Sequence, residues 1–327
     1  MQFRHPNRRE IIALLGATAW PLAARAQPVV HRIAFLSGPA GSASSPLTQA
    51  FRDGLADFDY VEGRNIAIEW RFARRNEDLP SLANELVQLK VEAIVATGGP
   101  AIRAVKQLTD SIPIVMAFSG DPVGTGLIGS LGRPGGNLTG LSMMSPDLSG
   151  KRLEILKEAL PTIRRVATLW NPDDPVYALE LQRTEAAARA LGISLHPVEV
   201  RTRDDFEPAF DAMSKSQVDA LVVFAHGLTI LNRDKLIELA GRHRLPTMFG
   251  SRESVADGGL MAYGPSIPAL YRRAAFYVDK ILKGSKPGEI PVEQPTNFEL
   301  AINLKTAQTL GIEFPQTLQA RADATIE

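Results

Sequence analysis

The sequence contains no cysteine. Disulfide bonds, thiolate metal sites, a cysteine nucleophile and a lipid anchor on an N-terminal cysteine are therefore all excluded. The sequence also has no excess of either charge, because 36 basic side chains balance 36 acidic ones. Proteins that bind nucleic acid or a membrane surface electrostatically carry a basic excess, so neither partner is expected.

Sequence motifs of catalysis and metal binding are missing as well. The chain has no G-x-S-x-G elbow, no H-E-x-x-H helix and no Walker phosphate loop. Residues 124–129 match G-x-G-x-x-G, but Asp121-Pro122-Val123 separates them from the preceding strand, which a dinucleotide fingerprint should follow directly. We interpret them as a glycine-rich connection, and we predict a protein that is not an enzyme and holds no cofactor or metal.

The apolar run near the N-terminus, residues 11–22, has about half of the roughly 20 residues that a transmembrane helix needs. It follows Arg4, Arg8 and Arg9 and precedes Ala24-Arg25-Ala26, which is the order of a secretory signal and its cleavage site. Residues 1–26 are thus predicted to be a signal peptide. The adjacent arginines leave both the general secretory and the twin-arginine route open. The mature protein is expected to be soluble, unlipidated and periplasmic.

An internal repeat dominates the rest of the chain. Arg32-Ile-Ala-Phe-Leu36 and Arg165-Val-Ala-Thr-Leu169 are short apolar segments that end in turn residues, and an amphipathic helix is predicted after each. Further on, Val91-Glu-Ala-Ile-Val95 and Val218-Asp-Ala-Leu-Val222 are nearly the same pentapeptide, and a glycine loop follows each. Two successive runs of alternating strands and helices predict an α/β protein with two similar lobes, each a doubly wound parallel sheet.

The length of 327 residues suits two domains of ordinary size. The stretch 113–142 ends the first repeat and is interpreted as the connection into the second lobe. Residues 260–265 resemble a second connection, and a third is expected between residues 291 and 297. The prediction assigns residues 27–140 and 265–290 to the first lobe, and residues 141–264 and 291–327 to the second.

The carboxyl ends of the strands are the predicted binding edge. Right-handed crossovers place these ends at one edge of each lobe, and open α/β sheets bind ligands there. If the two edges face each other, six loops line one cleft: residues 37–45, 97–100, 119–121, 170–175, 225–229 and 250–253. A cleft between two similar lobes is suited to enclosing a small molecule.

A series of short motifs resembles one protein family. In chain order these are Phe51-Arg-Asp-Gly-Leu, Tyr60-Val-Glu-Gly-Arg-Asn, Ala96-Thr-Gly-Gly, Ser119-Gly-Asp-Pro-Val, Arg133-Pro-Gly-Gly-Asn-Leu-Thr-Gly, Asn171-Pro, Gly258-Gly-Leu-Met-Ala-Tyr-Gly-Pro and Ala301-Ile-Asn-Leu-Lys-Thr-Ala. Together they resemble the substrate-binding proteins of ABC importers that are related to tryptophan- and tyrosine-binding proteins. The resemblance implies a type I periplasmic binding fold and no chemistry. The protein is then expected to be a monomer that captures a small solute, such as an amino acid or aromatic compound, and delivers it to a permease in the inner membrane.

Two other classes of function stay open at this point. A sensor would deliver the same closed form to a signalling receptor, and an α/β enzyme would use the same cleft for catalysis. The enzyme would need a catalytic constellation, which the sequence does not show.

The resemblance and the cleft loops together give the candidate ligand-binding residues: Ser37, Thr97, Gly98, Gly99, Ser119, Asp121, Trp170, Asn171, His226 and Tyr263. The amides of residues 97–99 precede a predicted helix, so they could bind an anion or only cap that helix. Asp121 and Asn171 could bind the solute or only form turns, and Trp170 and Tyr263 could stack on it or only pack in the core. His226 is either a ligand contact or an ordinary loop residue. Relatives that bind amino acids tend to have an acidic or amide side chain in this loop. His226 departs from that pattern, so the resemblance does not carry over specificity for an amino acid.

Overall fold

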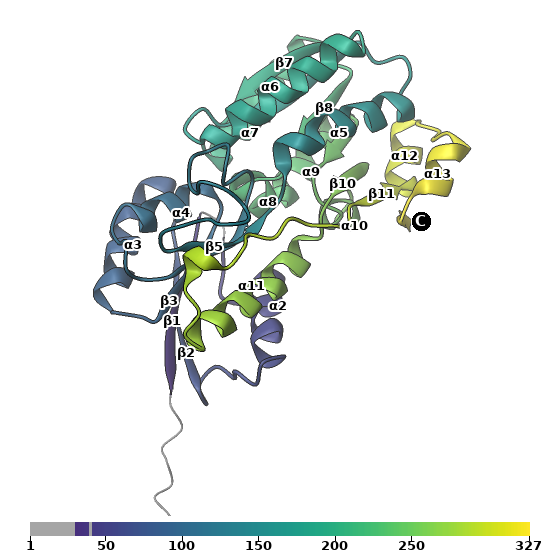
Figure 1. The fold of residues 1–327 in the computed structure, drawn as a ribbon. Helices are drawn as coiled ribbons and strands as arrows, with labels where there is room; N and C mark the ends of the chain where they lie inside the picture. The colour runs from purple at the N-terminus through teal and green to yellow at the C-terminus, as the bar shows by residue number, and fades with distance from the viewer. Residues whose placement is uncertain (1–29, 39–40) are drawn as a thin grey trace, which may run out of the picture. The chain divides into compact units, whose positions relative to one another are not determined.

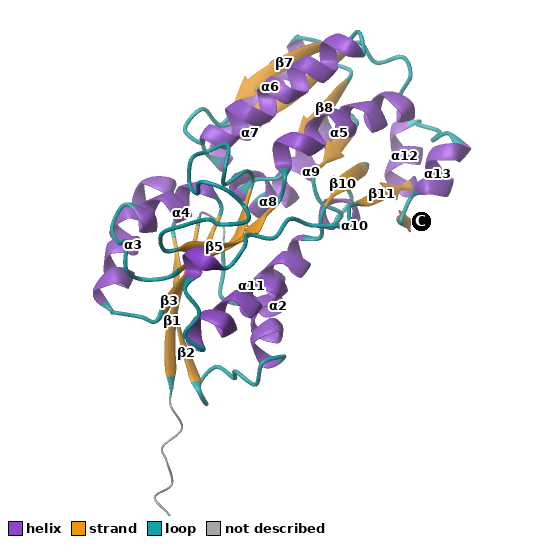
Figure 2. Ribbon diagram, viewed as in Figure 1, coloured by secondary structure: helices purple, strands orange, loops and turns teal. Residues whose placement is uncertain are grey.

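The computed structural model describes residues 30–38 and 41–327, so the predicted signal peptide lies outside the described residues. These residues form two sheets (Figures 1 and 2). The first has the order β2 (Ile66–Phe72), β1 (His31–Ser37), β3 (Ala93–Thr97), β4 (Ile114–Ser119) and β5 (Leu138–Ser142). The second has the order β12 (Ala324–Ile326), β11 (Glu299–Asn303), β10 (Met261–Gly264), β9 (Thr247–Phe249), β8 (Ala220–Val223), β6 (Arg165–Trp170) and β7 (Ser194–Glu199).

The internal repeat is visible in the strand orders. The strands of each lobe can be numbered one to five along the chain, as β1–β5 in the first lobe and β6–β10 in the second. In both sheets these strands lie side by side in the order two, one, three, four, five. All pairs among these strands are parallel, whereas β11 pairs antiparallel with β10. The predicted α/β fold with two parallel-sheet lobes is confirmed. The short edge strand β12 was not predicted from the sequence.

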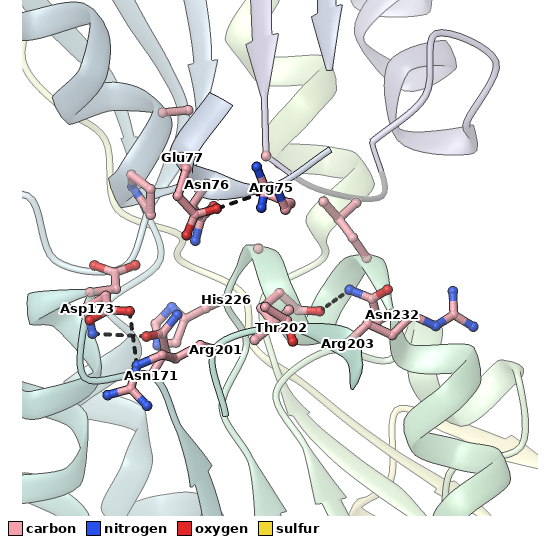
Figure 3. A pocket seen from close by; sticks show the side chains of 18 of the residues that line it. Arg75, Asn76, Glu77, Asn171, Asp173, Arg201, Thr202, Arg203, His226 and Asn232 are labelled. Atoms are coloured by element: carbon pink, nitrogen blue, oxygen red, sulfur yellow. Dashed lines mark hydrogen bonds and ion pairs between the residues drawn. The ribbon is translucent and has the colours of Figure 1, made fainter. Parts of the chain in front are cut away.

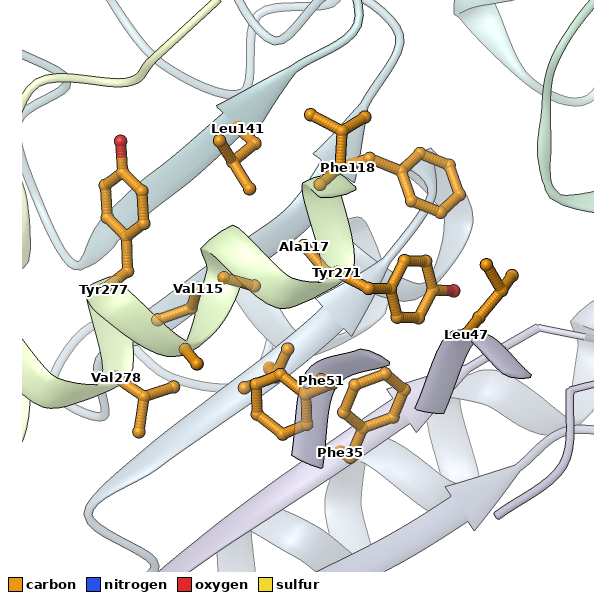
Figure 4. Close-up of a cluster of buried hydrophobic side chains, with 14 of the residues drawn as sticks. Phe35, Leu47, Phe51, Val115, Ala117, Phe118, Leu141, Tyr271, Tyr277 and Val278 are labelled. Carbon is orange, nitrogen blue, oxygen red and sulfur yellow. The ribbon is translucent and has the colours of Figure 1, made fainter. Parts of the chain in front are cut away.

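The first lobe buries its sheet between two helix layers, because alternate strand residues face opposite sides. Phe35 and Val115 face α2 (Pro46–Ala56) and α11 (Ile267–Leu282), whose Phe51 and Tyr271 pack on them (Figure 4). The neighbouring Leu36 lies on the other side of the sheet with α3 (Leu79–Gln88) and α4 (Gly99–Lys106). The long helix after β10 therefore belongs to the core of the first lobe.

The second lobe is layered in the same way. One face packs against α5 (Ser145–Ala159), α6 (Pro175–Ala190), α12 (Leu304–Leu310) and α13 (Gln316–Arg321). The other face packs against α7 (Phe206–Lys215) and α9 (Arg233–Arg242). The short helices α8 (Gly227–Leu231) and α10 (Glu253–Ala256) follow β8 and β9.

Local sequence explains where the helices that border the lobe edges begin. Ser45 precedes Pro46 and accepts a hydrogen bond from the Thr48 amide at the start of α2. Asp174 does the same for the Val176 amide at the start of α6, where Pro175 is the first helical residue. A short polar acceptor followed by proline satisfies a free N–H and presets the helical φ, so both starts are fixed by two residues each.

Within residues 30–38 and 41–327, three segments connect the lobes. The first is residues 143–144 between β5 and α5, where Met144 has a left-handed φ of 54°. The second is residues 265–266 between β10 and α11. The third leaves the 3₁₀ turn η3 (Pro287–Glu289) and runs beside β5, where the Ser142 amide donates to the Glu293 carbonyl at 2.9 Å, before it reaches β11. The residue limits predicted for each lobe stay a prediction.

Candidate functional site

A cavity of about 610 Å³ opens between the two lobes, within the roughly 300–1,000 Å³ typical of small-molecule sites. Its wall comes from the loops that follow β1, β2 and β3 in the first lobe and β6, β7 and β8 in the second. Figure 3 shows polar side chains from both sides: Arg75, Asn76 and Glu77 from the first lobe, and Asn171, Asp173, Arg201, Thr202, Arg203, His226 and Asn232 from the second. The cavity is therefore a two-lobe site whose wall includes polar and charged side chains from both lobes.

Matching turns in the two lobes hold part of this wall. The 3₁₀ turn η1 (Asn76–Asp78) follows β2, and η2 (Arg203–Asp205) follows β7. Asp78 accepts the Arg75 amide at 3.1 Å, and Asp205 accepts the Arg201 and Thr202 amides, both at 2.8 Å. These backbone hydrogen bonds lower the pKa of Asp205, because they favour its ionised form. Each aspartate thus fixes the backbone of a charged loop at the edge of the cavity.

Four of the residues predicted to bind a ligand line the cavity: Thr97, Gly98, Asn171 and His226. Two more lie directly behind the wall. The Thr97 hydroxyl donates to the Ser37 hydroxyl at 3.0 Å, and Gly99 is the first residue of α4. Their roles in binding stay predictions, but the sequence placed these six residues in one region.

The other four predicted residues lie elsewhere in the described structure. Ser119 is buried, and its carbonyl accepts the Met143 amide at 2.7 Å. Asp121 accepts the Gly124 amide at 2.8 Å and borders a separate cavity of about 310 Å³. Trp170 packs on the core of the second lobe, and the Tyr263 ring lies 6.2 Å from that of Phe298. None of the four lines the interlobe cavity.

In each lobe, one loop expected at the cavity does not line it and one loop that was not expected does. The loops after β4 and β9, residues 119–121 and 250–253, were expected there but supply no lining residue in the described structure. Residues 74–77 and 201–204 were not expected there but do line the cavity. The signal that could have found these is the repeated pattern of an arginine pair, Arg74 and Arg75 or Arg201 and Arg203, shortly before an acidic pair and a helix.

Behind His226 the second lobe holds a buried ionic chain. Glu180 on α6 accepts from Arg152 Nη1 on α5 at 2.8 Å, and both side chains are fully buried. His226 Nε2 lies 2.5 Å from the other Glu180 oxygen. Because a carboxylate only accepts, Nε2 carries the proton of this hydrogen bond. Arg152 Nε also donates to the Tyr263 carbonyl at 2.9 Å, next to the second connection between the lobes. His226 is therefore held in a fixed orientation from behind.

Burial governs ionisation around this chain. It lowers the pKa of Arg152, and the nearby Glu180 charge opposes that effect. Burial also raises the pKa of Tyr177 well above its usual value, with further contributions from the charges of Asp174 and Glu180. The Tyr177 ring, whose centroid lies 4.2 Å from that of His226, therefore presents a neutral phenol at the cavity wall.

The described residues give no sign of a metal centre or a membrane span. Across residues 30–38 and 41–327, no three histidine, aspartate or glutamate side chains gather closely enough to hold a metal ion. Within the same ranges, no helix combines the length and the apolar character that crossing a bilayer requires.

Residues 30–326 match the family described as ABC transporter substrate binding protein. The chain belongs to this family. Since the match covers nearly the whole chain, it includes both lobes and the cavity between them. The fold is the type I periplasmic binding fold, as the resemblance implied.

Curated relatives and solved structures support the assignment. The chain is 27% identical to the tyrosine-binding protein of Clostridioides difficile over 81% of this chain and 76% of that one. A conserved domain protein of Vibrio cholerae has a TM-score of 0.84 at 27% identity, covering 90% of this chain and 99% of that one. The ABC domain from Streptococcus pneumonia, solved in complex with L-Trp, has a TM-score of 0.83 at 23% identity, covering 91% and 100%. The last of these likenesses concerns the fold alone.

Proposed function

We propose that this substrate-binding protein is the periplasmic solute receptor of an ABC importer. It captures a small organic solute between its lobes as a monomer and hands it to a permease in the inner membrane. The observation that carries the proposal is the cavity of about 610 Å³ whose wall is shared by corresponding loops of both lobes. A site shared in this way binds the solute best when both halves contact it, so the solute favours the closed arrangement.

The cavity wall suits a solute that is polar on one side and apolar on another. Asn171 and Asn232 are buried amides that can both donate and accept hydrogen bonds. Leu228 and Leu231 add an apolar stretch beside them. An amino acid or a small aromatic compound has this division, and the curated relative named for tyrosine binding supports the same class.

A thermal-shift screen tests the proposal. The panel contains the twenty L-amino acids, benzoate, purines and thiamine-like heterocycles, and compounds that raise the melting temperature are then titrated by calorimetry. The expected result is one chemical class that binds with a stoichiometry of one and is recovered unchanged. Conversion of a bound compound during incubation would instead support an enzyme, and the absence of any stabilising compound would count against a small-solute receptor.

A further inference from the structure

An ion pair joins the two lobes at the side of the cavity. Arg103 lies on α4 of the first lobe, and Asp174 is the N-cap of α6 in the second. Their side chains meet at 2.9 Å, and Asp174 is only 7% exposed while Arg103 is 25% exposed. Partial burial reduces screening by solvent, so this pair is stronger than an ion pair on the open surface.

The Asp174 carboxylate also lies against the start of α4. A Cβ atom on Gly99 would be 2.9 Å from one Asp174 oxygen and 3.2 Å from the other, so the close approach requires glycine here. The first turn of a helix has free N–H groups and a partial positive charge, which favour a carboxylate. Arg103 and the N-terminal turn of α4 therefore both attract Asp174 toward the first lobe.

A second contact across the lobes lies beside the first. A Cβ atom on Gly120, in the loop after β4, would be 2.5 Å from Val176 Cγ2 and 3.1 Å from His226 Cε1. Val176 is in the same first turn of α6 that Asp174 caps. The first lobe thus contacts this turn twice, through a charge at one residue and through close packing at the other.

We propose that Arg103 and Asp174 form a clasp that holds the lobes together when no solute is bound. Asp174 also lines the cavity, so the clasp borders the site of the proposed function and rests on that function to this extent. Its loss shifts the solute-free protein toward open arrangements. An ion pair worth on the order of 1 kcal/mol corresponds to a roughly fivefold change in the ratio of open to closed molecules.

Distance measurement between two spin labels tests the clasp. Because the chain has no cysteine, labels can be attached to Ser81→Cys on α3 and Ala212→Cys on α7, both exposed, without background. Without solute, the otherwise unchanged protein should show mainly one short distance by double electron–electron resonance. Asp174→Asn, which keeps an N-cap acceptor, and Arg103→Gln should each raise the long-distance population about fivefold.

The controls separate the clasp from a general effect of lost charge. Asp257→Asn removes an ion pair with Arg233, 2.6 Å long and within the second lobe, and should leave the distances unchanged. The double variant Arg103→Gln/Asp174→Asn should open no further than either single variant. Wild-type distances in both single variants, or a wild type that is already mainly open, would overturn the clasp. A failure of every panel compound to bind, with the clasp result intact, would overturn only the proposed function.

Discussion

The Arg152 guanidinium and the Glu180 carboxylate meet at 2.8 Å with neither side chain reaching solvent. Removing both charges from water is costly, and the pair offsets that cost only while both partners are present. The pair supports His226 at the cavity wall and contacts the Tyr263 carbonyl beside a connection between the lobes. It therefore links the position of a cavity residue to the interior of the second lobe.

The first prediction concerns this pair. Glu180→Gln should lower the free energy of unfolding by about 3–5 kcal/mol, because it leaves the buried Arg152 charge without a counter-charge. Urea denaturation measures the change. The matched control is Glu158→Gln, which breaks an exposed pair with Arg321 of the same 2.8 Å length and should cost less than about 1 kcal/mol. An equal loss of unfolding free energy in the two variants would contradict the prediction, because burial of the Arg152–Glu180 pair would then make no difference.

The second prediction concerns Gly120. Gly120→Ala should push the two lobes apart, because its Cβ would overlap Val176, whose β-branched side chain has one strongly preferred rotamer in a helix. Small-angle X-ray scattering should report a larger radius of gyration without solute, and solute affinity should fall about three- to tenfold. Gly129→Ala is the control, since a Cβ there meets nothing within 4 Å. If both variants scatter alike, the contact at Gly120 does not limit closure.

The third prediction is a pH dependence. Burial raises the pKa of Glu253 above its usual value, so the folded state holds this proton more tightly than the unfolded state. The contribution of Glu253 to the free energy of unfolding is therefore present at low pH, and it is lost as the pH rises through the raised pKa. Glu253→Gln should be more stable than the wild type at pH 7 and no more stable at pH 4. A difference that does not change with pH would contradict the effect.

The strands and helices were predictable because their apolar patterns are local. The pentapeptides that begin at Val91 and Val218 contain the start of equivalent strands, and the pattern of α11 is amphipathic along its whole length. A short apolar segment of this kind is stable as a buried strand, and an amphipathic helix is stable with its apolar face packed on a sheet. Fold class therefore follows from the sequence alone.

The cavity wall was only partly predictable. Arg75 and Arg203 lie in charged, exposed loops, and such loops ordinarily face solvent. Only the placement of two lobe edges next to each other turns these loops into a cavity wall. The pairing of Arg103 with Asp174, 71 positions apart, depends on that placement as well, and no local pattern reports it.

A fourth prediction concerns export. If residues 1–26 are a signal peptide, the protein isolated from the periplasm should begin at Gln27. Intact-mass spectrometry of the secreted chain measures the start. Replacing Arg8 and Arg9 together by lysine should abolish export only if the twin-arginine route is used. A periplasmic protein that still begins at Met1 would contradict the signal peptide.

Native mass spectrometry tests the central claim, that the interlobe cavity is where a small solute binds. The protein is purified gently from the periplasm after growth in rich medium, and Thr202→Trp, which fills the cavity from an exposed position, is compared with Thr317→Trp on α13. A small bound mass is expected in the wild type and in Thr317→Trp, and it should be absent from Thr202→Trp. A bound mass that Thr202→Trp retains, or no bound mass in any of the three, would contradict it.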